Sequence, residues 1–318
     1  MNLKLSLARI AARTERFIDR FRGAETAQPE ITPYLGYATP THLIVRGRVL
    51  GKSKERLLRP DQSRFANFRA MVRLFHTDEI AGVQVSASDV TGQSDEEGYF
   101  TLELPRTDAV GRVEVPVHIG AEVCPCPVLI PRPNAAFGII SDVDDTMIYT
   151  GAYQLWRNLW TSLTGNAATR LVFPDAEHLM QRLDAGMNPV FFVSSSPWNF
   201  YGFLRDIMER SALPEGPMFL RDYGISETQF ITGTHGDHKG SAIDTIMAAN
   251  PDLSFVLVGD TGQHDAHVYA DAAKRHPGRV SMVILRQAGA KLDTPSIDAL
   301  RSAGVAVHVG ASYDDMDI

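Results

Sequence analysis

Carboxylates gather directly after one apolar stretch of the sequence. Residues 137–141 read Phe-Gly-Ile-Ile-Ser, and Asp142, Asp144 and Thr146 follow them. A short apolar run of this kind predicts a buried strand, and open α/β sheets hold their ligands at the carboxyl ends of such strands. Two carboxylates this close cannot both ionise cheaply, so such a pair usually holds a cation or divides the nucleophile and acid roles. A surface turn is the alternative, because Asp and Thr are also common turn residues.

A second apolar run and a lysine follow in the chain. The run at 190–193 ends in three hydroxyl side chains, which are Ser194, Ser195 and Ser196. Lys239 precedes apolar residues that recur at helical spacing between 243 and 247, so it is expected at the start of a helix. A serine at a turn and a lysine on the surface are the alternatives for these positions.

A third apolar run, 255–258, ends in Gly259 and Asp260, and Asp265 lies five residues beyond Asp260. Cleavage of a phosphate ester needs a nucleophile, an acid for the leaving alkoxide and neutralisation of charge around the phosphoryl oxygens. The carboxylates, hydroxyls and lysine of these segments are groups of those kinds. Their fixed order on successive predicted strands makes a chance combination improbable, although a motif stays a hypothesis until its structural context is known.

Together the four segments resemble the motifs of the haloacid dehalogenase superfamily of phosphatases. Within it, Asp142-Val-Asp-Asp-Thr146, Ser194-Ser-Ser-Pro-Trp-Asn199 and Gly259-Asp-Thr-Gly-Gln-His-Asp265 are similar to the actin-patch-protein type of phosphatidate phosphatase and its bacterial relatives. The resemblance covers roughly residues 130–290, and the last two motifs are the most specific to that family. One departure is Ser195, which stands where many relatives have Asn; it leaves Ser194 intact.

The resemblance implies a role for each matching residue. Asp142 is expected to be the nucleophile and to form an aspartyl-phosphate, and Asp144 is expected to protonate the leaving oxygen and then to activate the water. Thr146 would fix the loop through its hydroxyl, Ser194 would donate a hydrogen bond to a phosphoryl oxygen, and Lys239 would offset negative charge. Haloacid dehalogenases proper lack the second Asp, so Asp144 favours phosphoryl transfer over carbon–halogen cleavage.

The resemblance also implies Mg²⁺, an ion that prefers six oxygen ligands and keeps several waters. Asp142 and Asp260 would supply carboxylates and Asp144 its main-chain carbonyl. Asp265 would reach the ion through water. His235 and His238 lie just before Lys239 and suggest zinc, but no third His or Cys nearby completes a set, so loop histidines are the expected interpretation.

The tryptophans of the chain are candidates for substrate binding, together with Ser195 and Ser196. Trp156 and Trp160 lie in an apolar stripe at helical spacing, in the segment where this superfamily can insert a small cap. Trp198 is expected at the start of the helix that follows the strand of Ser194. Indoles beside a phosphate site suit a lipid ester. Packing of these rings in the core is the alternative.

Bulk composition bounds the class of protein. A chain of 318 residues with 44% apolar residues suggests two domains with ordinary cores. The net charge of −7 gives no general attraction to nucleic acid. Cys124 and Cys126 are the two cysteines, for which apolar packing in a reducing compartment is expected. We therefore expect a cytoplasmic protein that contacts membranes peripherally if at all.

The start of the chain is basic and amphipathic. Residues 1–22 mix Lys and Arg with apolar residues at helical spacing but lack the apolar core and cleavage site of a signal peptide. Such a helix could lie on an anionic bilayer or pack on protein. No run of 18 apolar residues predicts a transmembrane helix.

Periodicity divides the chain into an N-terminal helix and linker over 1–41, a small antiparallel β-sandwich over 42–133 and a phosphatase domain over 134–318. Alternating apolar and polar residues in the second segment predict half-buried antiparallel strands. A helix with Phe65, Phe68, Val72 and Phe75 on one face is expected within it. Apolar runs that alternate with helical patterns from residue 137 predict an α/β fold, a Rossmann-like parallel sheet with helices on both faces.

The favoured function is a Mg²⁺-dependent phosphomonoesterase. Family resemblance makes phosphatidate at a membrane surface the first substrate to test, whereas the residues alone indicate only a phosphate monoester. One alternative is a phosphatase of a soluble metabolite or phosphoprotein. The other is a non-catalytic scaffold on a phosphatase fold, against which the intact Asp142, Asp144, Lys239 and Asp260 argue.

Overall fold

The computed structural model describes residues 28–51, 79–148, 172–221, 235–262, 264–287 and 292–316. Three expectations lie outside these residues: the amphipathic helix over 1–22, the helix between 65 and 75, and the tryptophan stripe over 155–163. Within the described part of the chain, no helix combines the length and apolarity needed to cross a bilayer.

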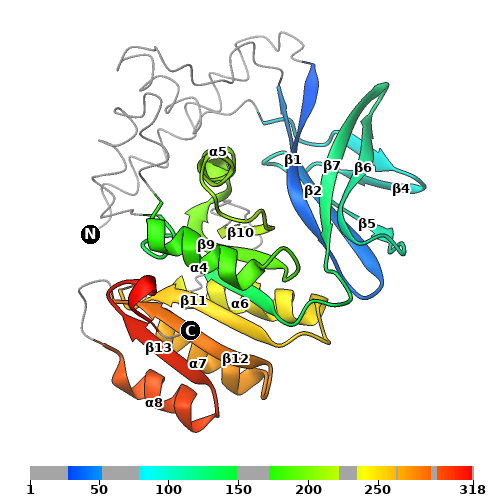
Figure 1. Ribbon diagram of the computed structural model, residues 1–318. Coiled ribbons are helices and arrows are strands. Elements are labelled where there is room, and N and C mark those ends of the chain that lie inside the picture. Colours follow the sequence, from blue (N-terminus) through cyan, green and yellow to red (C-terminus); the bar gives the residue numbers. More distant parts are fainter. Residues whose placement is uncertain are drawn as a thin grey trace, which may run out of the picture.

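The second half of the chain forms a six-stranded sheet in which every strand pair is parallel (Figure 1). Its spatial order is β10-β9-β8-β11-β12-β13. The strands are β8 (Gly138–Asp142), β9 (Val190–Pro197), β10 (Met218–Arg221), β11 (Phe255–Asp260), β12 (Val280–Arg286) and β13 (Ala306–Gly310). The central strands β8 and β11 are buried along their whole length, which is why they read as unbroken apolar runs.

Helices cover both faces of this sheet, as predicted. They are α4 (Pro174–Asp184), α5 (Tyr201–Arg210) after the short turn η2 (Trp198–Phe200), α6 (His235–Ala249), α7 (Asp265–Arg275) and α8 (Thr294–Ser302). Ile139 and Phe192 pack with α4 and α5 on one face, whereas Ile140 and Phe191 pack with α6, α7 and α8 on the other. Each such buried side chain contributes about 1.5–3 kcal/mol to folding.

The topology explains why the predicted site residues meet. From β8 the chain passes to β9 and β10 on one side, then returns to β11 on the other side of β8. The sequence order of the strands therefore reverses between β8 and β11, and ligands of open α/β sheets bind at the carboxyl ends of strands at such a point. Asp142 and Asp260 are the last residues of these two strands.

The first half of the chain forms a seven-stranded sheet of order β4-β3-β6-β7-β1-β2-β5. Its strands are β1 (Pro29–Ala38), β2 (His42–Gly51), β3 (Gln84–Ala87), β4 (Val90–Gln93), β5 (Tyr99–Pro105), β6 (Gly111–Ile119) and β7 (Glu122–Ile130). Pairs are antiparallel except β1 with β7. The sheet curls so that its outer strands β4 and β5 contact each other around an apolar core. It is thus one curled sheet rather than the two stacked sheets of the predicted sandwich.

Two local predictions for this region were wrong. The expected linker up to residue 41 contains β1, whose Pro29 and Pro33 pair with β2, while β7 is in ladder register with β1 only at Gly36 and Tyr37. Proline is tolerated there because the other edge of that stretch makes no ladder bonds. The polar segment 91–98 predicts a turn between two alternating runs, but its first three residues belong to β4, which forms a hairpin with β3. A short outer strand needs no apolar alternation, so its sequence gave no strand signal.

Candidate active site

Asp142 is a buried carboxylate at the end of β8, 1% exposed, and the loop after it is tightly closed. The Thr146 hydroxyl donates to Asp142 Oδ2 at 3.2 Å, and the amides of Met147 and Ile148 both donate to the Val143 carbonyl at 3.0 Å. Asp145 adopts a left-handed backbone with φ of 59°, which Asp tolerates better than most residues. The predicted role of Thr146 as the residue that fixes this loop agrees with this geometry.

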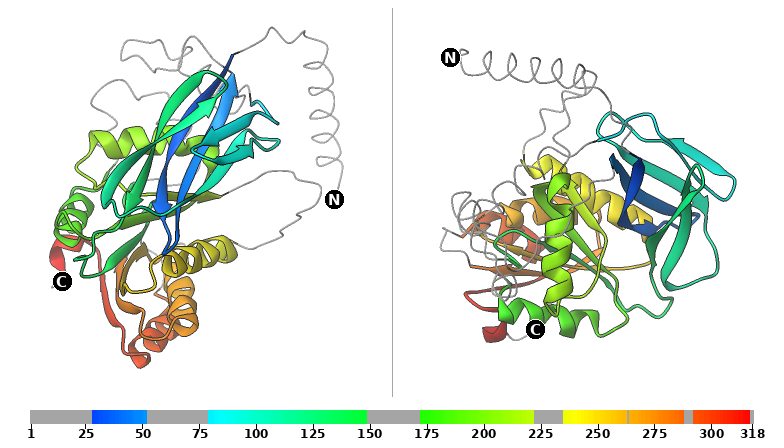
Figure 2. Two further views of the ribbon diagram at one scale, coloured as in Figure 1. Left: turned by 90° about the vertical axis from the view of Figure 1, so that its right-hand side faces the viewer. Right: turned by 90° about the horizontal axis from the view of Figure 1, so that it is seen from above.

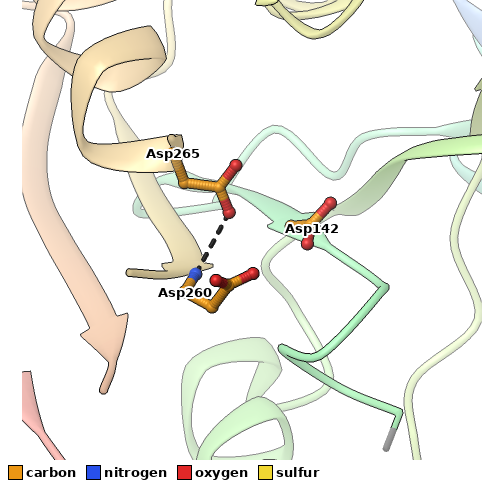
Figure 3. Close-up of side chains that lie close together, drawn as sticks. All are labelled: Asp142, Asp260 and Asp265. Carbon is orange, nitrogen blue, oxygen red and sulfur yellow. Dashed lines mark hydrogen bonds between the residues drawn. The ribbon is translucent and has the colours of Figure 1, made fainter. Parts of the chain in front are cut away.

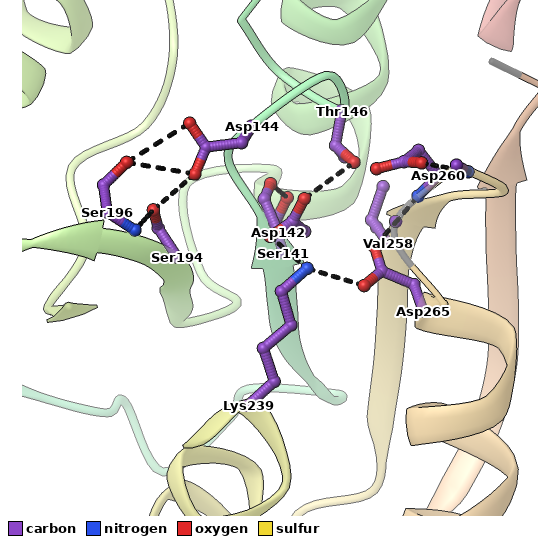
Figure 4. A network of polar contacts seen from close by, with 12 residues as sticks. Ser141, Asp142, Asp144, Thr146, Ser194, Ser196, Lys239, Val258, Asp260 and Asp265 are labelled. Atoms are coloured by element: carbon purple, nitrogen blue, oxygen red, sulfur yellow. Dashed lines mark hydrogen bonds and ion pairs between the residues drawn. The ribbon is translucent and has the colours of Figure 1, made fainter. Parts of the chain in front are cut away.

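Lys239 lies between two carboxylates at the floor of the site (Figure 4). Its Nζ is 2.8 Å from Asp142 Oδ1 and 2.6 Å from Asp265 Oδ1. The lysine projects from the second turn of α6, which begins one turn earlier than predicted. Burial alone would lower the pKa of Lys239, but the charges of Asp142 and Asp265 outweigh it and raise the pKa, so the side chain stays cationic.

Asp260 and Asp265 complete a cluster of three buried carboxylates (Figure 3). Asp265 opens α7, and its Oδ2 accepts a hydrogen bond of 3.1 Å from the main-chain amide of Asp260. One carboxylate oxygen from each of Asp142, Asp260 and Asp265 lies within 4.8 Å of the others.

Gly259 makes this cluster possible. A Cβ atom at Gly259 would lie 2.5 Å from Asp265 Oδ2 and 2.7 Å from the Tyr269 hydroxyl, distances shorter than van der Waals contact. Tyr269 in turn donates to the Val258 carbonyl at 2.8 Å. The Gly-Asp pair of the third motif therefore serves packing as well as chemistry: the glycine leaves room for the carboxylate five residues on.

The cluster fits a hard divalent cation. Its donors are carboxylate oxygens, which Mg²⁺ and Ca²⁺ prefer over softer metals. Lys239 brings one positive charge to four carboxylates, those of Asp142, Asp144, Asp260 and Asp265, and buried charges of one sign are stable only when they are compensated. Among the described residues, the group that could hold a metal contains no His. His238 was expected in a loop but lies in α6.

The carboxyl of Asp144 has different partners. Ser194 donates to its Oδ2 at 2.6 Å, and the Ser196 hydroxyl lies 3.3 Å and 3.2 Å from its two oxygens (Figure 4). The Ser196 amide donates to Ser194 Oγ at 2.9 Å, which holds the two serines together. In this structure Ser194 thus donates to Asp144, whereas the resemblance gives it a phosphoryl oxygen as acceptor.

Burial raises the pKa of both carboxyls of the first motif. For Asp142 it raises the pKa well above the usual range; Lys239 opposes the shift, whereas Asp265 and Asp144 add to it. For Asp144 burial again dominates, and the hydrogen bonds from Ser194 and Ser196 oppose it. The charge of Lys239 also opposes the rise in the pKa of Asp144. The two carboxyls differ in their direct contacts, which are a fixed cation for Asp142 and neutral hydroxyls for Asp144.

The residues predicted to bind substrate do not all lie at the carboxylate cluster. Trp198 is half-buried and stacks on Tyr34 of β1, with ring centroids 5.1 Å apart and planes at 9°. Its indole therefore packs between the two sheets, as the packing alternative supposed. Ser195 and Ser196 are half-buried at the end of β9. Trp156 and Trp160 lie outside the described residues.

Sequence reasoning missed a support behind the loop that follows β8. Tyr313, in the turn η3 (Tyr313–Asp315), is buried, and its hydroxyl lies 3.5 Å from the Thr146 carbonyl and 3.4 Å from that of Gly259. Asp175 accepts the Tyr313 amide at 2.8 Å and pairs with Arg286, whose guanidinium stacks on the Tyr313 ring at 4.5 Å. No motif marks these residues, because their roles arise only when distant segments meet.

Comparison with known proteins finds one matching family model and relatives that match about half of this chain. The family model described as "Phosphatidate phosphatase APP1, catalytic domain" matches residues 137–287. Phosphatidate phosphatase APP1 of Saccharomyces cerevisiae is 28% identical over 163 residues, which are 51% of this chain and 28% of that protein. An uncharacterized protein of Schizosaccharomyces pombe is 30% identical over 152 residues, 46% of this chain and 24% of that protein.

The chain thus spans less than a third of the length of these curated relatives. A carbohydrate acetylesterase from Xanthomonas citri aligns in structure over 81% of this chain and 68% of its own, with 12% identity and a TM-score of 0.29, too low to support any inference. The matched segment contains β8 to β12 and every carboxylate of the cluster. The resemblance expected from the motifs is confirmed: residues 137–287 of this chain match the family of APP1 phosphatidate phosphatase catalytic domains.

Proposed function

We propose that this protein is a Mg²⁺-dependent phosphomonoesterase of the haloacid dehalogenase superfamily, with phosphatidate as its first candidate substrate. The observation that carries the proposal is that two carboxyls two residues apart in the sequence have different partners. Asp142 contacts Lys239 at 2.8 Å, whereas Asp144 accepts hydrogen bonds from serines. The cation beside Asp142 favours its ionised form, which is the form that attacks phosphorus, and hydroxyl partners leave Asp144 able to carry a proton.

In the first step, an oxygen of Asp142 forms a bond to phosphorus as the bond from phosphorus to the ester oxygen breaks. The leaving alkoxide takes the proton of Asp144, and an aspartyl-phosphate remains on Asp142. In the second step Asp144, now ionised, removes a proton from water, whose oxygen attacks phosphorus. Asp142 is released as a carboxylate together with inorganic phosphate, and Asp144 is protonated again.

Electrostatics of the site support this division. Lys239 would stabilise the negative phosphoryl oxygens as well as Asp142. Ser194 would exchange its hydrogen bond to Asp144 for one to a phosphoryl oxygen when substrate enters. Mg²⁺, held by Asp142, Asp260 and the main-chain carbonyl of Asp144, would neutralise charge on the transferred group. Both oxygens of Asp265 already accept hydrogen bonds or an ion pair from the protein, which favours an orienting role for this residue.

The substrate class follows from the family. The curated relative from Saccharomyces cerevisiae is a phosphatidate phosphatase, so a role in lipid metabolism at a membrane surface is proposed here. A soluble phosphomonoester is the second candidate. Packing of Trp198 against Tyr34 favours it, because this indole is engaged within the protein and not offered to acyl chains.

The test is a phosphate-release assay of the purified chain on phosphatidate vesicles, glycerol phosphate and nitrophenyl phosphate. We expect release in millimolar Mg²⁺, its loss with a chelator and its return with Mg²⁺ but not Zn²⁺. Preference for phosphatidate over glycerol phosphate would support the lipid substrate. Release from none of the three, by folded protein with Mg²⁺, would overturn the proposed function and favour the scaffold alternative.

A further inference from the structure

The segment that ends the second motif leaves the active site and enters the contact with the N-terminal sheet. Ser194 and Ser196 hold Asp144, but Trp198, Asn199 and Tyr201 point to β1, β2 and β5. The curled sheet lies beside β9, β10 and α5 (Figures 1 and 2). The proposed chemistry uses the serines and gives no role to the residues that follow them.

Asn199 is fixed by Arg48, a residue of β2 that is 2% exposed. Arg48 Nη1 donates to Asn199 Oδ1 at 2.9 Å, and Arg48 Nε donates to the Glu97 carbonyl at 2.7 Å. Its remaining nitrogen pairs with Glu79, and the guanidinium stacks on the Tyr99 ring at 4.4 Å. Four partners fix the orientation of the guanidinium. Because its donors lie in one rigid plane, it fixes the position of Asn199 more firmly than a flexible lysine would.

Aromatic rings secure the same segment. Tyr34 contacts Trp198 and Tyr201, with centroid distances of 5.1 Å and 4.1 Å, and the Leu35 amide donates to the Tyr201 hydroxyl at 2.8 Å. Tyr34 is therefore part of the apolar core beneath α5 although it belongs to β1. A ring pair of this kind contributes about 0.5–1.5 kcal/mol beyond burial of its area.

Arg46 joins the two sheets a short distance away. Its Nη2 donates to the Leu35 carbonyl at 3.0 Å and to the Met218 carbonyl of β10 at 3.2 Å. The same guanidinium lies over the Trp198 ring at 5.4 Å and the Phe219 ring at 4.9 Å. The contact is thus built from buried, directional interactions at the end of β9, and not from scattered surface pairs.

We infer that Arg48 is a positioning residue of the phosphatase reaction, which acts through Asn199 to fix the serines that hold Asp144. The N-terminal sheet is then a working part of the catalytic unit. The inference rests on the proposed function, because it assigns the sheet a role in the same site. Asn199 is three residues from Ser196, so a displaced Asn199 shifts the Ser196 and Ser194 hydroxyls; misplacement by about 1 Å can cost about a hundredfold in rate.

The test compares four variants of the full chain. Arg48→Met and Asn199→Leu remove the hydrogen bond, while Asn199→Asp keeps an oxygen acceptor for Arg48. Arg112→Met is the control: it removes another pair between the two domains, with Glu215, in which both side chains are about half exposed. Kinetics on nitrophenyl phosphate and hydrogen exchange of the amides between 194 and 201 are measured for each.

We expect Arg48→Met and Asn199→Leu to lower kcat by about tenfold or more with a smaller change in KM, and to speed amide exchange in this segment. Asn199→Asp and Arg112→Met should behave like the wild type. The double variant Arg48→Met with Asn199→Leu should lose no more than the worse single variant, because the two residues act through one contact.

Wild-type kcat and exchange in Asn199→Leu would overturn the inference. If Arg48→Met fails to fold, the pair of Asn199 variants decides, because both leave the other partners of Arg48 in place. A wild-type protein that releases no phosphate would overturn the proposed function instead. Amide exchange in the same variants would then still decide whether the sheet fixes this segment.

Discussion

The two halves of the site treat their carboxylates in opposite ways. On the side of β11 and α7, Asp142 shares Lys239 with Asp265, and all three side chains are buried. On the side of β9, the half-buried Asp144 accepts hydrogen bonds from Ser194 and Ser196, neutral groups that stabilise an anion less than a cation does. One half therefore gives its carboxyl a cation that favours the ionised form, and the other gives its carboxyl neutral hydrogen-bond donors.

Replacement of the proposed nucleophile, Asp142, should have the largest effect. Asp142→Asn leaves an amide that cannot attack phosphorus, so phosphate release should fall by at least about a thousandfold, as for other nucleophile variants. Circular dichroism and a cooperative thermal transition should show a folded protein. Turnover near the wild-type rate in this variant would remove the distinction between the two halves.

Loss of the Lys239 ammonium group should lower both activity and stability. In Lys239→Met, Asp142 and Asp265 lose their shared partner, so kcat should fall by about a hundredfold and the free energy of unfolding by about 3–5 kcal/mol. The control is Arg275→Met, which removes an ion pair with Asp244 in which both groups are over a third exposed; it should cost at most about 1 kcal/mol.

The pH dependence of the Lys239→Met variant sharpens this prediction. Burial already raises the pKa of Asp142 in the folded protein, and loss of Lys239 raises it further. A carboxyl whose folded pKa exceeds its unfolded pKa binds its proton more tightly when folded, so the stability of the variant should fall as pH rises from about the usual Asp value, about 3.9, toward neutrality. Denaturant titrations across this range would measure it; a loss that is the same at every pH would mean that packing, not charge, causes the destabilisation.

Replacement of the proposed acid should depend on the substrate. In Asp144→Asn, hydrolysis of glycerol phosphate should fall by about a hundredfold, because its alkoxide needs a proton. Nitrophenyl phosphate has an acidic leaving group and should lose less in its first step. Measured kcat/KM values that fall equally on both substrates would argue against Asp144 as the acid.

The smallest effect is expected at Ser196. Ser196→Ala removes one of the two hydroxyls that hold Asp144, and a net hydrogen bond of about 0.5–1.5 kcal/mol corresponds to a rate loss of about tenfold or less. Ser196→Thr keeps the hydroxyl and should retain most activity. A loss in Ser196→Ala as large as that in Asp144→Asn would show that the serine does more than orient its neighbour.

The parallel sheet and the core of its site were predictable from the sequence for one physical reason. Strands buried on both faces read as unbroken apolar runs, and the carboxyl ends of neighbouring parallel strands meet at one edge. Asp142, Ser194 and Asp260 end three such runs, so their proximity follows from the pattern alone. The apolar runs at 137–141, 190–193 and 255–258 correspond to β8, β9 and β11.

Contacts between distant segments were not predictable in the same way. Tyr313 behind the nucleophile loop, Arg48 against Asn199, and Tyr34 against Trp198 have no local signature, because each depends on how separate elements pack. The acceptor of the Ser194 hydroxyl was also outside the reach of sequence, since it depends on a side-chain torsion. Family motifs identify the residues that perform the chemistry but not those that hold them in place.

The division between the two carboxyls can be tested most directly by trapping the covalent intermediate. Asp144→Asn lacks the base for the second step, so nitrophenyl phosphate should phosphorylate the variant faster than water releases the phosphate. Acid quenching followed by tandem mass spectrometry should then find phosphate on the Asp142 side chain. Turnover of the same substrate with no phosphate found on Asp142 at any time during the reaction would contradict the account.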